Sequence, residues 1–200
     1  MTTGRAVAFL LFALVASGTP GPSNVMLTAT GAQVGIVRGL PCLLGQTTGM
    51  GLMLFCVLSG LGSVVLSHPA VLRALHWAGP AVLLWLAWRV ATAPGHLDAP
   101  GGRPVGYFGA ALFQWVNPKA WLVIASAAGT FLTAGAGTAA VQAASLGVLF
   151  VAAALPACFP WLAFGAAVQR LLRTPRRLRI FNTGMALLLA LSILIIVRGG

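Results

Sequence analysis

Acidic residues are nearly absent from this chain. Asp98 is the only Asp or Glu among 200 residues, against 12 Lys and Arg, which gives a net charge of +11. Charged residues make up 6% of the sequence, whereas a soluble domain carries about 25%. Hydrophobic residues make up 59%, and the mean hydropathy is +0.97. Because these few polar residues cannot cover the surface of a soluble protein, we expect an all-α integral membrane protein with several spans.

Several other absences exclude function classes. No acid lies in an apolar segment, which excludes an intramembrane carboxylate relay for protons. No Gly-x-x-x-x-Gly-Lys-Ser/Thr motif occurs, which excludes an ATP-driven pump in this chain alone. No Ser/His/Asp set lies within the apolar segments, so we do not expect an enzyme. The arginines flank apolar segments without forming a basic face, so nucleic acid is not an expected partner.

Cysteine is also scarce. The three cysteines lie in apolar segments without Cys-x-x-Cys spacing, at Cys42, Cys56 and Cys158. An odd number at membrane depth does not suggest a disulfide framework. We interpret them as small buried apolar residues and expect no metal and no cofactor.

Two interruptions lie inside apolar segments. The first apolar segment, about 7–30, contains Thr19-Pro20-Gly21-Pro22-Ser23-Asn24, and a later one, about 107–133, contains Asn117-Pro118-Lys119. Proline removes a backbone donor and crowds the preceding turn, so neither stretch can hold a regular helix. In hydrocarbon, broken backbone survives only beside packed protein or a cavity. Paired breaks in two halves of a chain point to a transporter's substrate site.

The apolar pattern predicts six spans in two halves. The spans cover about 7–30, 40–66, 71–93, 107–133, 139–168 and 180–197, with a connection at 31–39 and interruptions of the fifth span at Pro156 and Pro160. The polar stretch 94–104 divides the chain nearly in half. We therefore expect one transmembrane domain over 1–200, with repeat one at about 1–93, a linker at 94–104 and repeat two at about 105–200. An alternative makes the start of the chain, up to about Ser17, a cleaved signal peptide.

The distribution of arginine predicts the orientation. Six spans place Arg5, Arg73 and Arg198 on one side, and the other eight arginines on the opposite side, which with Lys119 makes the full 12 basic residues. The positive-inside rule then predicts that both termini lie outside, and three spans per half make the repeats inverted.

Polar residues near the breaks are the candidate site. Lys119 at membrane depth costs about 2.5–3.5 kcal/mol, so it either snorkels to the interface or serves a substrate carboxylate or a titration. Asn24 is expected to cap free N–H groups at a half-helix start. The polar residues either contact substrate or only satisfy broken backbone. The candidate substrate-binding residues are Pro20, Gly21, Pro22, Ser23, Asn24, Gln46, Gln114, Asn117, Pro118 and Lys119.

Small residues in the second span indicate close helix packing. Gly45-x-x-x-Gly49 lets another backbone approach, either within the chain or in a homodimer. The expected partners are the lipid bilayer and a small-molecule substrate, with a second copy of the chain as one of the two alternatives for this glycine face.

The two breaks resemble those of the LysE/RhtB family of amino-acid exporters. The resemblance rests on Thr19-Pro20-Gly21-Pro22 with Asn24, and on Asn117-Pro118-Lys119, and it extends over essentially the whole chain. Trp77-Ala78-Gly79, 84–89, 113–117 and Gln169-Arg170-Leu171 are similar to the branch that contains cysteine/O-acetylserine exporters.

The resemblance implies secondary efflux of amino acids or their derivatives across the bacterial inner membrane. It also implies substrate contact around 20–24 and 117–119. Two departures bear on the substrate. Ser23 stands where the family often has asparagine, and Gln46-Thr47-Thr48 stands where members are usually more apolar. The proton-motive force is the expected energy source.

Two alternatives remain for a chain of this shape. One is a passive channel lined by the same breaks, which counterflow in vesicles distinguishes from a carrier. The other is a membrane thiol-redox or assembly protein, which the scattered cysteines disfavour.

Overall fold

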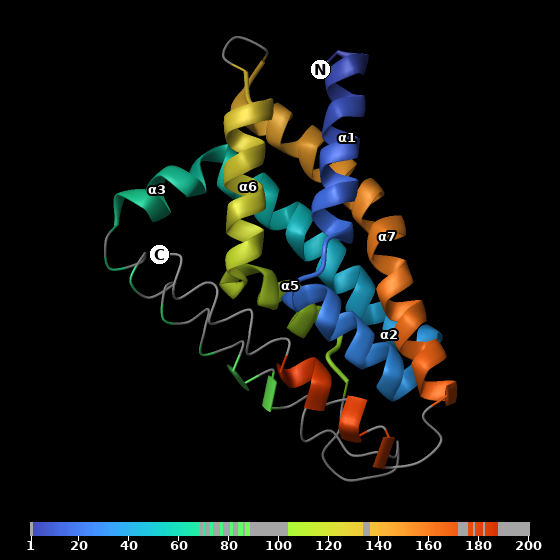
Figure 1. The fold of residues 1–200 in the computed structure, drawn as a ribbon. Helices are drawn as coiled ribbons and strands as arrows, with labels where there is room; N and C mark the ends of the chain where they lie inside the picture. The colour runs from blue at the N-terminus through green and yellow to red at the C-terminus, as the bar shows by residue number, and fades with distance from the viewer. Residues whose placement is uncertain are drawn as a thin grey trace.

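The computed structural model describes residues 2–68, 104–133 and 137–171, and scattered positions within 70–88 and 176–187. Every regular element in these ranges is helical (Figure 1), which confirms the all-α prediction. The elements are α1 (Thr3–Gly18), α2 (Pro22–Cys56), the π-helix η1 (Val57–Leu61), α3 (Gly62–Ser67), α5 (Tyr107–Val116), α6 (Pro118–Phe131) and α7 (Ala139–Leu171). Most of the predicted third and sixth spans and of the linker at 94–104 lie outside the described residues, so six spans in inverted repeats stay a prediction.

The first break lies where the sequence predicts it. α1 ends at Gly18, and α2 begins at Pro22, after Gly21 in extended backbone with φ −177° and ψ 176°. Proline is tolerated in the first helical turn because the N–H it lacks would have no helical partner there. In Figure 1, the chain continues from α1 into α2 without reversing direction.

The turn between the first and second predicted spans is much shorter than the predicted connection over 31–39. α2 has two helical parts that meet at Gly35, whose φ of 76° and ψ of −176° are non-helical. The Thr30 hydroxyl lies 3.7 Å from the Cys42 sulfur, whereas 12 residues of straight helix would rise about 18 Å. The chain therefore turns back at Gly35, as the ribbon in Figure 1 shows. The nine-residue connection was wrong because one glycine at positive φ suffices for the reversal.

The second break is also confirmed. Asn117, with φ −83° and ψ 111°, ends α5 and begins α6, and Pro118 is the first helical residue after it. The predicted fourth span is therefore two half-helices. It ends at Phe131, close to the expected boundary.

The predicted interruptions of the fifth span are wrong. α7 passes through Pro156 and Pro160 as one helix of 33 residues. Prolines are tolerated inside membrane helices when neighbouring helices supply packing and hydrogen bonds. α7 packs against both α1 and α2, and the contact is close: a Cβ added at Gly165 would lie 2.0 Å from the Thr28 carbonyl oxygen.

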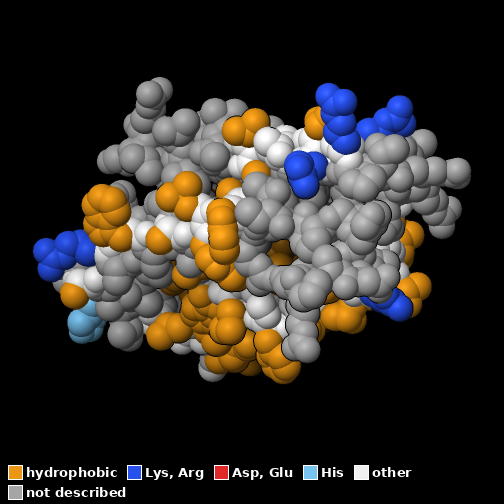
Figure 2. Space-filling model, turned by 90° about the horizontal axis from the view of Figure 1, so that it is seen from below, with side chains coloured by type: hydrophobic (Ala, Val, Ile, Leu, Met, Phe, Trp, Pro, Cys, Tyr) orange, Lys and Arg blue, Asp and Glu red, His pale blue; other side chains and the backbone are white. Residues whose placement is uncertain are grey.

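The surface is that of a membrane protein. Val15, Leu122 and Val148 are each about 70% exposed, as side chains that face lipid are. Two helical stretches of the described residues, Pro22–Leu61 and Ala139–Val168, are long and apolar enough to cross a membrane, although the first includes the turn at Gly35. Figure 2 shows hydrophobic side chains gathered over one face, with Lys and Arg mostly towards its edges.

Candidate functional site

Three backbone carbonyls at the first break accept hydrogen bonds from side chains. Asn24 Nδ2 donates to Ser17 O at 2.8 Å and to Thr19 O at 2.9 Å. Trp161 Nε1 of α7 donates to Gly18 O at 3.2 Å. The broken backbone is thus stabilised by packed protein, as hydrocarbon surroundings require.

The predicted role of Asn24 as an N–H cap is wrong. Its amide nitrogen donates to carbonyls at the end of α1 instead of accepting from the start of α2. Gly21 occupies the N-cap position of α2, and no side chain caps this end. Asn24 is the third residue of α2, beyond the cap position, so its side chain can reach back to α1.

The second break is capped by its own asparagine. Asn117 Oδ1 accepts from the Lys119 backbone N–H at 3.1 Å, which is an N-cap bond for α6. Asn117 Nδ2 donates to Ser23 Oγ at 2.9 Å, and Ser23 Oγ donates to Gln114 Oε1 at 3.1 Å. Ser23 therefore bonds the first break directly to the second.

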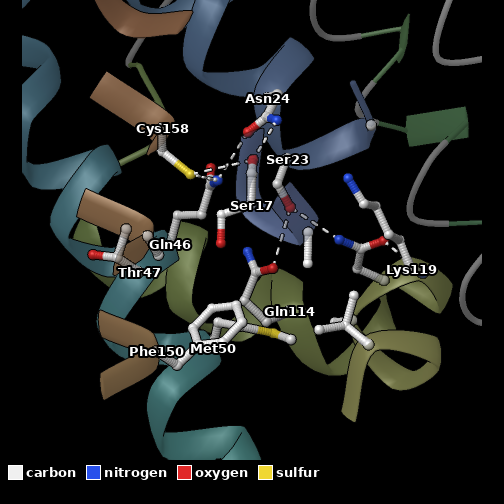
Figure 3. A pocket seen from close by; sticks show the side chains of 16 residues that line it. Ser17, Ser23, Asn24, Gln46, Thr47, Met50, Gln114, Lys119, Phe150 and Cys158 are labelled. Carbon is white, nitrogen blue, oxygen red and sulfur yellow. Dashed lines mark hydrogen bonds between the residues drawn. The ribbon is translucent and has the colours of Figure 1, made fainter. Parts of the chain in front are cut away.

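A cavity of about 50 Å³ lies between the two breaks. On the same measure a water molecule needs about 10–15 Å³, so the cavity holds a few waters or a small polar molecule. Figure 3 shows its side chains converging from α1, α2, α5, α6 and α7. The lining residues are Ala16, Ser17, Gly21, Ser23, Asn24, Gln46, Thr47, Met50, Gln114, Asn117, Lys119, Ala120, Val123, Phe150, Ala154 and Cys158.

The structure brings most of the candidate residues together. Of the ten, the seven that line the cavity are Gly21, Ser23, Asn24, Gln46, Gln114, Asn117 and Lys119. The three prolines Pro20, Pro22 and Pro118 do not line it. They lie at the breaks, where the missing N–H and fixed φ of proline end or begin the helices.

Sequence reasoning missed the contribution of α7. Phe150, Ala154 and Cys158 line the cavity from this helix, and Ser17 lines it from α1. α7 is apolar on all sides, so its pattern does not mark the face towards the cavity. The only signal was Cys158 itself, a weakly polar residue that was interpreted as a small hydrophobe.

The cavity wall is mostly apolar, with a few polar side chains and almost no charge. Lys119 is the only Lys, Arg, Asp or Glu among the residues that line it in the described part of the chain. Asn24, Gln46, Gln114 and Asn117 are each at most 5% exposed. Most hydrogen-bonding groups of these four amides already bond to the protein, and the groups left over beside the Lys119 ammonium are suited to orient a small polar molecule.

The family model that matches this sequence is the LysE type translocator, over residues 14–197. The chain belongs to the LysE type translocator family. The resemblance stated from the two breaks is thereby confirmed. As a LysE translocator the protein is a membrane transporter, and the cavity between its helix breaks is the candidate transport site.

Several curated proteins are similar to this LysE translocator. The cysteine/O-acetylserine efflux protein of Escherichia coli (strain K12) is 32% identical over 134 residues, which is 66% of this chain and 68% of the relative. The protein of the same name from Shigella sonnei (strain Ss046) gives the same values. That of Shigella flexneri serotype 5b (strain 8401) is 32% identical over 127 residues, 62% of this chain and 64% of the relative. No solved structure matches the chain.

Proposed function

We propose that this LysE translocator exports small amino acids or amino-acid derivatives from the bacterial cytoplasm across the inner membrane. The observation that carries the proposal is the meeting of both helix breaks at one cavity with a single cation. The cysteine/O-acetylserine efflux activity named for the relatives supports a small zwitterion as the substrate.

The carboxylate of the substrate binds at Lys119. Of the three N–H donors of its ammonium, one is bonded to Thr19 O at 2.6 Å, which leaves two for a ligand. Lys119 also lies against the uncapped start of α2: a Cβ at Gly21 would meet its Cδ at 2.8 Å. The glycine thus makes room for the lysine beside the positive end of the helix dipole, where an anion is stabilised.

Transport proceeds by alternating access to this cavity. The bonds of Ser23 to Asn117 and Gln114, and of Lys119 to Thr19 O, hold the broken segments together. Breaking and remaking them on one side at a time would open the cavity to the cytoplasm and then to the outside. A small cavity with the two breaks bonded across it favours a carrier over an open channel.

The proton-motive force drives export in this proposal. The cavity lining contains no carboxylate among the described residues, so Lys119 is our candidate for the group that titrates during the cycle.

Efflux from preloaded cells tests the function. Cells loaded with a panel of labelled amino acids are compared for the intact protein, Asn117→Ala and Lys119→Met. We expect faster loss of one substrate class with the intact protein, and at least tenfold slower loss with either variant at equal membrane levels.

The matched control is Arg5→Met, which also removes a cation bonded to a helix-end carbonyl. Arg5 Nη2 donates to Phe131 O, and Arg5 does not line the cavity. It should retain efflux. If well-inserted intact protein accelerates the loss of no panel member, amino-acid export is wrong. If Lys119→Met exports normally, the role of the lysine is wrong.

A further inference from the structure

Two side-chain oxygens in the cavity wall, Ser17 Oγ and Gln46 Oε1, have no hydrogen-bond partner among the described residues. Ser17 Oγ is a hydroxyl that can donate or accept, whereas Gln46 Oε1 can only accept. Gln46 is 5% exposed, and its Oε1 is buried without a partner among the described residues. Nearly all buried polar groups in proteins are paired, so an unpaired one that lines a cavity points to a ligand.

The orientation of this amide is fixed by the first helix break. Asn24 Nδ2 faces two backbone carbonyls, Ser17 O and Thr19 O, which can only accept. The amide nitrogen of Asn24 must therefore point at these two carbonyls, and the amide oxygen of Asn24, Oδ1, must point away from them. That oxygen lies 3.3 Å from the amide nitrogen of Gln46. The Gln46 atom that faces Asn24 Oδ1 must be the amide nitrogen, because the Gln46 oxygen in that place would repel the Asn24 oxygen.

The sulfur of Cys158 accepts a hydrogen bond from the second N–H of the Gln46 amide. Gln46 Nε2 donates to Cys158 Sγ at 3.4 Å, and the thiol donates onward to Ser17 O at 3.7 Å. Every donor of Asn24, Gln46 and Cys158 is then engaged, and Gln46 Oε1 remains as a free acceptor. This end of the cavity can accept a hydrogen bond, whereas Lys119 can only donate one.

Figure 3 shows Gln46 and Cys158 on one side of the cavity and Lys119 on the other. Resting on the proposed function, we infer that Gln46 Oε1 accepts a hydrogen bond from the α-ammonium of the zwitterion whose carboxylate binds Lys119. Gln46 is then a specificity-determining residue, because the site requires a donor on the carbon next to the carboxylate. A site built to bond such a donor rejects an analogue that lacks it, by factors of about 10⁴ in favourable cases.

Three probes of similar size distinguish binding through a hydrogen bond from binding through shape alone. Alanine, lactate and isobutyrate share a carboxylate and a methyl group, and they carry on the adjacent carbon an ammonium, a hydroxyl and a methyl group. The readout is protection of Cys158 from methyl methanethiosulfonate in purified protein with Cys42→Ala and Cys56→Ala. We expect protection at the lowest concentration with alanine, then lactate, and at a concentration at least tenfold higher with isobutyrate.

Two variants locate the effect. Gln46→Met keeps the volume but removes the acceptor, so the three probes should protect within about threefold of one another. Gln142→Met makes the same chemical change outside the cavity, where Gln142 bonds Thr133 and Gly137, and should preserve the order.

Equal protection by alanine and isobutyrate, protection by none of the probes, or an unchanged order in Gln46→Met would overturn the inference. The probe series in the protein with intact Gln46 decides the matter even if Gln46→Met fails to fold. Protection reports binding without transport. If the probes protect in the expected order but the protein exports no amino acid, the proposed function is wrong and this inference stands. If the protein exports amino acids but the probes do not protect in that order, this inference is wrong and the proposed function stands.

Discussion

The Nζ of Lys119 donates to the backbone carbonyl oxygen of Thr19 at 2.6 Å, although 100 positions separate the two residues. The same carbonyl oxygen accepts from Asn24 at 2.9 Å. One oxygen at the first break therefore contacts both the side chain that holds that break and the cation of the second. A carboxylate bound to the two remaining donors of Lys119 would therefore contact a side chain that bonds both breaks.

Removing the Asn24 side chain is expected to destabilise the protein. Asn24→Ala takes one partner from Ser17 O, one from Thr19 O and one from Gln46 Nε2. Ser17 O keeps the Cys158 thiol and Thr19 O keeps Lys119, but one N–H of Gln46 is left unpaired. A buried donor left unpaired costs about 1–3 kcal/mol, so we expect a loss of that size in the free energy of unfolding. Denaturant unfolding of purified protein in detergent measures it.

Ser126→Ala is the control for Asn24→Ala, because it removes an exposed hydroxyl that bonds only to Leu122 O within α6. It should change stability by about 0.5 kcal/mol or less. Equal effects of the two variants would contradict the role given to Asn24.

Close packing of α2 on α7 predicts that Gly165→Ala is harmful. The added Cβ would lie 2.0 Å from Thr28 O and 3.0 Å from the Ala32 backbone nitrogen, and backbone atoms cannot move aside as a flexible side chain would. Overpacking costs about 1–3 kcal/mol, so the unfolding temperature should fall. Gly129→Ala in α6, where nothing lies within 4 Å, should be neutral or gain up to about 1 kcal/mol. If both variants melt alike, the close contact is wrong.

The turn at Gly35 predicts a disulfide. Because the Thr30 hydroxyl lies 3.7 Å from Cys42 Sγ, Thr30→Cys should form a bond with Cys42 under mild oxidation. Mass spectrometry of peptides detects the link. Thr30→Cys combined with Cys42→Ala should give no intramolecular link. An unbent α2 would separate positions 30 and 42 by about 18 Å, and no bond would then form in either protein.

The orientation of the chain is a separate prediction. Eight arginines fall on the side of the 1–2, 3–4 and 5–6 connections and three on the side of the termini, so a reporter fused after Gly200 should read outside. The same reporter inserted within 94–104 should read cytoplasmic. A cytoplasmic signal from the fusion after Gly200 would show that the number of spans or the orientation is wrong.

The membrane class and both helix breaks followed from the sequence alone. Scarcity of charge is a property of composition, and a proline lacks its N–H wherever it lies, so Pro22 and Pro118 mark the half-helix starts without any tertiary knowledge. Five of the seven cavity residues were named because polar side chains beside broken backbone have few places to go in lipid. Gly21 belongs to the first break itself, and Gln46 was named as a polar residue inside the second span.

The tertiary structure decided which groups meet and what each one bonds. Whether Asn24 caps the start of α2 or satisfies the end of α1 depends on where the two helices lie, and Ser23 reaches Asn117 only because the fold brings together residues 94 positions apart. The cost of Pro156 and Pro160 likewise depends on their neighbours, and packing against α1 and α2 keeps α7 continuous. Local chemistry determined where the helices break, and long-range packing determined what the breaks form together.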